Sequence, residues 1–348
     1  MSRRGWVLFA ALSVIWGVPY LLIRIAVRDF SPPTLVFFRT APAGIAFLPF
    51  ILGRESLAAM RRRWVPLIVY TVIEVAIPWL LLSRAEQRLT SSLSGLLIAT
   101  VPLVAVVFSW ATRHEGPLGR SRLVGLAVGF AGVAVIVGID VQGPDAWAVA
   151  EVVGVAVCYA VGPFIVDRHL NQVPSVSVVG ASLLLSGIGY APFGLTHLPS
   201  RVSPEEISSV ILLVVLCTAT AFILYFALIA EVGPARATVI TYINPAVAVV
   251  LGIVLLHEHF TVGLAFGIPL VLVGSFLGTG GIRPDGQRSP GQGSQTPVHD
   301  GQPGQPGPGV GEGLGDRGQD LEAERAPQGD GAGIRLDDSI ELHRPEPG

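Results

Sequence analysis

Lysine is absent from this sequence, and all 23 basic residues are arginine. The absence excludes the phosphate-binding lysine of a P-loop, a Schiff-base lysine and the ATP-binding lysine of a kinase. Cysteine is scarce as well: Cys158 and Cys217 both lie in apolar segments, so the chain contains neither a disulfide framework nor a paired-cysteine motif. Any ATP-driven role would need another subunit, and we expect neither a cofactor nor a metal site.

Charged residues are also few. They make up 14% of the chain, against about a quarter in soluble proteins, whereas 51% of the chain is hydrophobic. Residues 1–281 contain 17 arginines and 13 acidic residues, while residues 282–348 contain 6 arginines and 12 acidic residues. The sequence thus predicts a membrane-embedded body followed by a separate polar tail.

The body contains ten apolar stretches. A helix of about 20 residues crosses a hydrocarbon layer about 30 Å thick, and each stretch approaches that length. We therefore predict an all-α membrane protein with ten transmembrane helices, at approximately residues 6–23, 34–52, 64–82, 89–111, 123–139, 146–166, 176–195, 207–230, 237–256 and 262–280.

The arginines predict the orientation of the chain, because cytoplasmic loops are enriched in them. With the N-terminus inside, twelve arginines of the body and its border fall in inner segments and five at outer ends. Arg3-Arg4 before an apolar run also fits a cleavable export signal, but nine further spans favour an uncleaved first helix. We predict a multi-pass protein of the cell (inner) membrane with both termini in the cytoplasm.

The tail is rich in glycine and proline. Residues 282–348 contain 15 Gly and 9 Pro among 67 residues. The segment has too few apolar side chains to offset the entropy of ordering. We predict a disordered acidic tail on the cytoplasmic side; a short docking motif around Ile334 to Leu342 is the alternative.

The body contains an internal repeat. Residues 102–107 match 245–250, and the same offset places His114-Glu115 opposite His257-Glu258. Pro19 and Arg24 likewise fall opposite Pro163 and Arg168, and residues 125–129 match 263–267 after a short gap. The pattern predicts two five-helix units, residues 1–141 and 142–281. Because five is odd, the second unit enters the membrane in the opposite direction, an arrangement typical of secondary transporters.

Particular motifs accompany this repeat. The first apolar stretch contains Ile15-Trp16-Gly17, the second contains Phe38-Arg39, and a glycine-rich helix follows each of the stretches 102–115 and 245–258. In these features residues 6–280 resemble the EamA-like family of the drug/metabolite transporter superfamily. The resemblance implies ten helices in two inverted halves and export or exchange of small metabolites, amino acids or drugs without ATP. The second half departs from it by having Leu183 roughly where the first has Arg39.

Glu74 is the strongest single candidate for chemistry. It lies about ten residues into its span, about 15 Å deep, close to the bilayer midplane. An intramembrane carboxylate is costly unless it is protonated, paired or hydrated, and it is by default a functional candidate. Pro78 removes the N–H that would bond the Glu74 carbonyl. We predict proton or cation coupling at Glu74; a buried structural carboxyl is the alternative.

Arg39 lies about five residues from the outer end of its predicted helix. Its long side chain has three interpretations: it extends to the membrane surface, it pairs with Glu74, or it binds an anionic group of the substrate.

Other prolines repeat the kink of Pro78. Pro19, Pro102, Pro163 and Pro245 interrupt predicted helices, and freed carbonyls are tolerated in a membrane only where protein or a water-filled cavity satisfies them. We expect a polar cavity, although ordinary packing is the alternative for each residue of its lining. The predicted lining residues beside Glu74 and Arg39 are Trp16, Trp79, Tyr159, Tyr225, Tyr242 and Asn244.

The GxxxG spacings Gly125/Gly129, Gly263/Gly267 and Gly274/Gly278 predict close packing within the bundle or a homodimer. His257-Glu258-His259 lacks HExxH spacing and reads as a helix end, and Glu151 reads as an interfacial residue. No basic patch interleaved with aromatics indicates nucleic-acid binding.

Together these features predict a secondary active transporter that works by alternating access on a small-molecule substrate within the lipid bilayer. The alternatives are a receptor or scaffold that uses its tail and a membrane-embedded lipid-modifying enzyme. A carrier predicts that Glu74 and the residues of the kinked helices line one central cavity.

Overall fold

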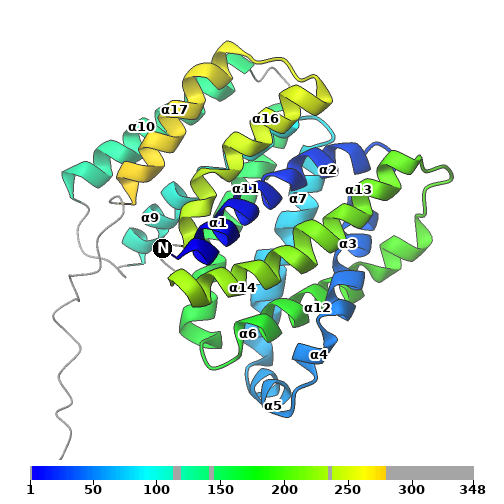
Figure 1. Ribbon diagram of the computed structural model, residues 1–348. Helices are drawn as coiled ribbons and strands as arrows, with labels where there is room; N and C mark the ends of the chain where they lie inside the picture. Colours follow the sequence, from blue (N-terminus) through cyan, green and yellow to red (C-terminus); the bar gives the residue numbers. More distant parts are fainter. Residues whose placement is uncertain (1, 113–118, 141–144, 234–236, 280–348) are drawn as a thin grey trace, which may run out of the picture. The chain divides into compact units, whose positions relative to one another are not determined.

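The computed structural model describes residues 2–112, 119–140, 145–233 and 237–279, which all belong to one compact unit, Met1–Gly286. The predictions for His114-Glu115 and for the tail 282–348 lie outside these residues. Within the described ranges all regular secondary structure is helical (Figure 1). An all-α membrane protein is therefore the correct fold class.

The helical segments follow one another with short connections. In chain order they are α1 (Arg3–Ile15), α2 (Val18–Ala26), α3 (Pro32–Ala46), α4 (Leu48–Ile51), α5 (Arg54–Arg62), α6 (Trp64–Tyr70), η1 (Thr71–Ala76), α7 (Ile77–Ala85), α8 (Ser91–Ile98), α9 (Val101–Ala111), α10 (Arg120–Asp140), α11 (Asp145–Ile165), η2 (Val166–Leu170), α12 (Ser175–Thr196), α13 (Pro204–Val214), η3 (Val215–Thr220), α14 (Ala221–Val232), η4 (Thr238–Tyr242), α16 (Asn244–Leu256) and α17 (Val262–Gly278).

Eight stretches of described helix are long and apolar enough to cross a membrane. They are Arg3–Ala26, Trp64–Ala85, Ser91–Ala111, Arg120–Ile139, Asp145–Leu170, Ser175–Thr196, Pro204–Val232 and Val239–Leu256. The predicted number of ten is not confirmed. The expected span 34–52 is interrupted at Phe47, between α3 and α4, and the expected span 262–280 forms the 17-residue helix α17.

Four of the predicted kink prolines lie in the first turn of a new helical segment. Pro19, Pro78, Pro102 and Pro245 each occupy the first or second position of a segment, where the missing N–H has no helical partner to lose. Pro163 instead stays inside α11, just ahead of the π-helical segment η2. Four of these prolines therefore mark a boundary between helical segments, whereas α11 continues through Pro163.

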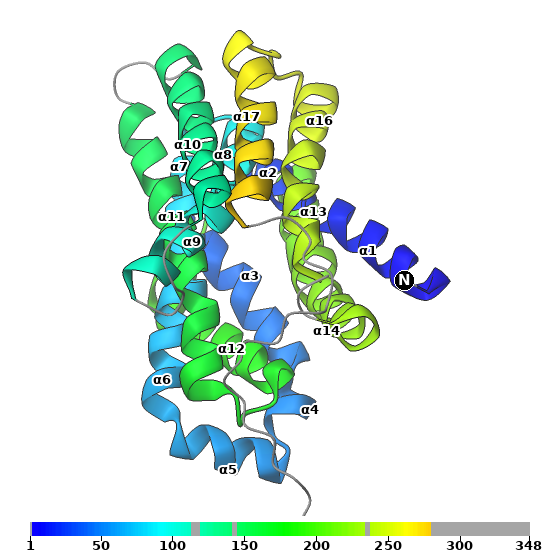
Figure 2. The same ribbon diagram turned by 90° about the vertical axis from the view of Figure 1, so that its left-hand side faces the viewer.

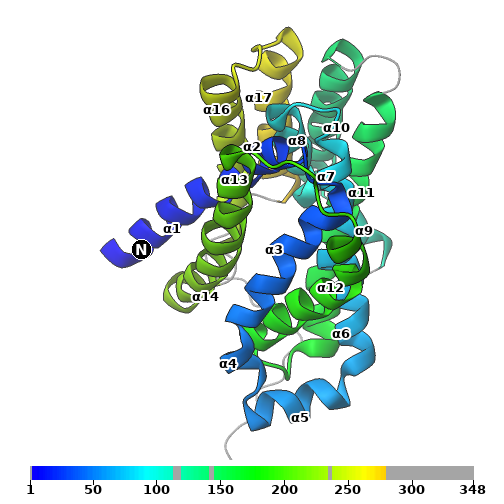
Figure 3. The same cartoon turned by 90° about the vertical axis from the view of Figure 1, so that its right-hand side faces the viewer.

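Two antiparallel helix pairs connect the first half of the body to the second. In one pair α10 packs along α17, with Gly125 against Gly278 and Gly274 against Gly129 (Figures 1 and 2). In the other pair α3 packs along α12, where Gly44 lies against the backbone of Leu184 (Figure 3). The glycines allow the backbones to approach closely, so the GxxxG glycines at 125/129 and 274/278 pack inside the bundle.

Candidate functional site

Glu74 lies in a π-helical turn. The turn η1 sits between α6 and α7 in one continuous span, and Pro78 follows at the start of α7. Because proline lacks the N–H that would continue the α-helical pattern, the backbone widens by one residue here. Such wide turns inside α-helices occur frequently at functional sites.

The carboxylate of Glu74 packs directly against α11. A methyl group added at Gly162 would overlap this carboxylate, so only glycine leaves room for it. The Oε2 atom of Glu74 is buried and has no hydrogen-bond partner in the described residues. Gly162 immediately precedes Pro163. The glycine is the feature of the sequence that indicates the close approach of α11 to the Glu74 carboxylate. An acid in such surroundings requires a proton, a cation or water.

Arg39 is buried inside the bundle. Its side chain is 8% exposed, and the guanidinium carbon lies 3.7 Å from the centre of the Trp79 ring, a cation–π contact. The Nε–H group donates to the Thr218 hydroxyl at 3.2 Å. Arg39 therefore does not extend to the surface, and no ion pair within 4.0 Å joins it to Glu74 in the described part of the chain. An anion-binding role for Arg39 stays a prediction.

Thr218 is a residue that the sequence analysis did not identify. It is fully buried in η3, the π-helical segment of the span 204–232, and its hydroxyl donates to the Leu213 carbonyl at 2.7 Å. The offset of 144 that places Pro163 opposite Pro19 also places Thr218 opposite Glu74. That register was the available signal, and the two π-helical segments η1 and η3 occupy matching positions of the two halves.

Aromatic side chains connect these groups. Tyr159 of α11 interacts electrostatically with both Glu74 and Arg39, and Tyr225 interacts with Glu74. Trp16, at the break between α1 and α2, lies with its ring centre 4.8 Å from that of Tyr225. The structure thus brings together six of the predicted residues in one cluster: Glu74, Arg39, Trp16, Trp79, Tyr159 and Tyr225.

The two remaining candidates have local structural partners. The Tyr242 hydroxyl lies 2.8 Å from the hydroxyl of Thr279, beyond the end of α17. The Asn244 amide, oriented to satisfy its surroundings, donates to the carbonyl oxygens of Ser13 and Ile240 at 3.0 and 2.9 Å. Asn244 therefore stabilises the start of α16 against α1.

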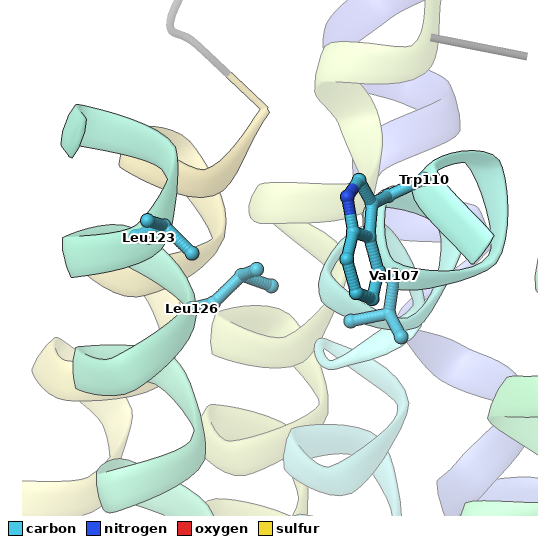
Figure 4. A pocket seen from close by; sticks show the side chains of 4 residues that line it. All are labelled: Val107, Trp110, Leu123 and Leu126. Carbon is cyan, nitrogen blue, oxygen red and sulfur yellow. The ribbon is translucent and has the colours of Figure 1, made fainter. Parts of the chain in front are cut away.

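Two cavities border the bundle, and neither is lined by Glu74 or Arg39. One, of about 330 Å³, lies between Val107 and Trp110 of α9 and Leu123 and Leu126 of α10 (Figure 4). The other, of about 250 Å³, lies between the α6–η1 region and α12. A central cavity lined by Glu74 stays a prediction.

Two further predictions concerned charged residues near helix ends. Glu151 is buried, and its carboxylate pairs with Arg84 at 3.0 Å; its position at the membrane interface stays a prediction. Glu258 accepts hydrogen bonds from the backbone N–H groups of Ser91 and Ser92 at 2.7 and 3.0 Å, where α8 begins. His257-Glu258-His259 therefore terminates α16 and caps α8. Within the described ranges, no group of three or more His, Cys, Asp or Glu side chains is positioned to hold a metal ion.

Glu74 and Arg39 belong to the same cluster but form no ion pair with each other in the described residues. Glu74 and Arg39 both interact with Tyr159, yet each keeps its own contacts. Such an arrangement can receive a molecule that carries a cationic and an anionic group, or exchange a proton for a cationic group at the carboxylate.

Both halves of the body match the same family of known proteins. The profile of the EamA-like transporter family matches residues 3–138 and again residues 146–279. The uncharacterized inner membrane transporter YedA of Escherichia coli K12 is 30% identical over 77% of this chain and 90% of its own length. The uncharacterized transporter YvbV of Bacillus subtilis is 25% identical, over 78% and 90%.

Two further matches extend this comparison. A probable terminal-alkyne amino-acid exporter of Streptantibioticus cattleyicolor is 24% identical over 81% of this chain and 93% of its own. A solved crystal structure matches with a TM-score of 0.57 at 20% identity, over 80% of this chain and 97% of that one, and shares the fold.

Proposed function

The chain belongs to the EamA-like transporter family, and on this premise we propose that it is a secondary carrier that exports or exchanges small amino-acid-like metabolites by alternating access. It is a membrane transporter built from apolar helices. The proposal adds the mechanism, the direction, the class of substrate and the coupling ion.

One observation carries the proposal: Glu74 places an unpartnered carboxylate oxygen in the middle of a membrane-length helix, where a π-helical turn and Gly162 make room for it. A purely structural carboxyl would be expected to satisfy both oxygens, because an unpaired buried polar atom costs about 1–3 kcal/mol. A carboxyl that must bind and release a proton or a cationic group has a reason to remain unpaired.

Alternating access requires two halves that can exchange arrangements. The family profile matches twice, and the π-helical segments η1 and η3 and the helix breaks at Pro102 and Pro245 recur in register. The antiparallel pairs α3–α12 and α10–α17 each take one helix from either half. These features support ten helices in two inverted repeats.

The charges support a zwitterionic substrate. Arg39, stacked on Trp79, retains guanidinium N–H groups for a carboxylate, and Glu74 offers an acceptor for an ammonium group. The relative named as a probable terminal-alkyne amino-acid exporter supports the same class. Competition between a proton and the ammonium group at Glu74 would couple export to proton entry.

A proteoliposome assay tests the proposal. The purified full-length chain is reconstituted, loaded with a mixture of amino acids that includes one with a terminal alkyne, and given a pH gradient. We expect gradient-dependent efflux of a subset of the mixture. Glu74→Gln should abolish the dependence on the gradient, while Glu205→Gln, which removes an exposed carboxylate, should not. Gradient-dependent efflux at the wild-type rate in Glu74→Gln would refute coupling at Glu74.

The scaffold alternative makes a separate prediction. A chain that acts through its tail loses function when residues 282–348 are removed, whereas a carrier truncated after Gly281 retains transport. The truncated chain in the same assay separates the two functions.

A further inference from the structure

Among the described residues, a second buried carboxyl without a hydrogen-bond partner lies away from Glu74. Glu86 directly follows α7, outside the span Trp64–Ala85, and its side chain is 0% exposed. Neither of its carboxylate oxygens has a hydrogen-bond partner. Arg24 of α2 donates to the backbone carbonyl of Glu86 and not to its carboxylate. This residue is not among the candidates that the sequence indicated.

Four charged or titratable side chains from other elements interact with Glu86. Arg24 and Tyr20 come from α2, Arg39 comes from α3, and Glu258 comes from the turn between α16 and α17. On its own helix, Arg84 is paired with Glu151 of α11. The nearby positive charges thus have other contacts, and Glu86 has no ion-pair partner within 4.0 Å in the described residues.

The carboxyl groups of Glu86 and Glu258 have opposite surroundings. Glu258 accepts hydrogen bonds from two backbone N–H groups at the start of α8 and from the Ser92 hydroxyl. Glu86 receives no donor. Burial raises the pKa of the Glu86 carboxyl well above its ordinary value of 4.5, the Glu258 charge raises it further, and Arg24 and Arg39 lower it in part. The burial of Glu86 and its lack of a hydrogen-bond donor both favour the protonated form of this carboxyl.

The contact made by Glu258 joins the two halves of the chain. It fixes the turn after α16, in the second half, to the start of α8, in the first. A methyl group at Gly252 would overlap both Glu258 and Ser92, so the contact is tightly packed. We propose that Glu86 is a second proton-binding site, separate from Glu74, that is occupied while Glu258 holds α8. Release of this contact admits water to Glu86, and the proton leaves.

Proton binding at Glu86 does not depend on the proposed carrier function; only its part in a transport cycle does. Infrared difference spectroscopy of the purified full-length chain detects protonated carboxyl groups directly. At neutral pH we expect carboxylic-acid bands in the wild type, one of which is lost in Glu86→Gln and retained in Glu74→Gln. Glu205→Gln, at an exposed carboxylate, should leave the bands unchanged. The retained band in Glu74→Gln tests the proposal even if Glu86→Gln does not fold.

Thermal unfolding against pH gives a second measurement. The carboxyl has a higher pKa folded than unfolded, so its contribution to stability is complete below pH 4.5 and is lost as the pH rises toward the folded pKa. We expect the Tm of the wild type to fall by about 2–4 °C per pH unit over that window. Glu86→Gln should reduce this fall, and Glu205→Gln should leave it unchanged.

The outcomes separate this site from the carrier proposal. Loss of the band and a smaller pH-dependent fall in Glu86→Gln support the site even if no transport is detected. An unchanged band and an unchanged fall in Glu86→Gln overturn it. Disappearance of the acid band on addition of sodium chloride at constant pH also overturns it, because a metal cation would then occupy the carboxylate.

Discussion

At the residue scale, two neighbours from different helices contact the guanidinium group of Arg39: the ring of Trp79 and the hydroxyl of Thr218. Thr218→Val keeps the shape of the side chain but removes the acceptor for Arg39 and the donor to Leu213. Leaving buried polar groups unpaired costs about 1–3 kcal/mol. We expect a lower Tm and a raised KM for a zwitterionic substrate, measured by thermal unfolding and by uptake kinetics. Thr112→Val, at an exposed threonine of α9's end, is the control; equal effects in both variants would contradict a role for Thr218.

Gly162 provides a test of Glu74 that leaves the carboxylate chemically intact. In Gly162→Ala the added methyl group overlaps the carboxylate, so we expect its displacement and a loss of gradient-dependent efflux of at least tenfold, or about 1.4 kcal/mol. Gly154→Ala on the same helix meets only the flexible end of Leu81 at 3.3 Å. It should transport like the wild type, and an equal loss in both variants would show that α11 simply does not tolerate alanine.

The candidate site was partly predictable from residue types. Glu74, Arg39 and Trp79 were found because charge and proline are rare and costly in a membrane, and the structure places them together. Tyr242 and Asn244 were expected in the cavity because they flank Pro245. The structure shows their hydrogen bonds to neighbouring segments, and their place in the cavity lining stays a prediction. Thr218 gave no signal of its own, since a single hydroxyl is inexpensive to bury.

At the element scale, the pair α10–α17 depends on small residues. In Gly274→Ala the new methyl group would overlap the backbone of Gly129, and we expect overpacking to lower the free energy of unfolding by about 1–3 kcal/mol. Gly138→Ala in α10 meets nothing within 4 Å and should be neutral or slightly stabilising. Thermal unfolding in detergent gives the Tm values of the two variants for comparison. If the two variants have the same Tm, the close packing does not contribute to stability.

The positions of the helices were predicted better than their continuity. Apolar length identified every membrane-length stretch, because hydrophobicity alone sets the span. The break at Phe47 and the π-helical turns arise from backbone hydrogen bonding and tertiary packing, which composition does not encode.

At the scale of the whole molecule, inverted repeats fix the side of the membrane on which each loop lies. Five membrane-length helices separate Arg62 from Arg201, so the two residues should lie on opposite sides. Cysteine substitutions at these exposed positions, in a chain with Cys158 and Cys217 replaced, allow labelling with a membrane-impermeant reagent. We expect only one of the two to react from outside the cell. Reaction of both from the same side would refute the inverted arrangement.

The bond from Arg39 to Thr218 has no mirror image, because Leu183 occupies the equivalent place in the second half. Two identical repeats would give the inward-open and outward-open forms equal energy and equal populations at rest. Under the proposed alternating access, we expect this bond to form in only one arrangement of the halves. Arg39 would then favour one resting orientation of the protein, and with it the side of the membrane from which the substrate first binds.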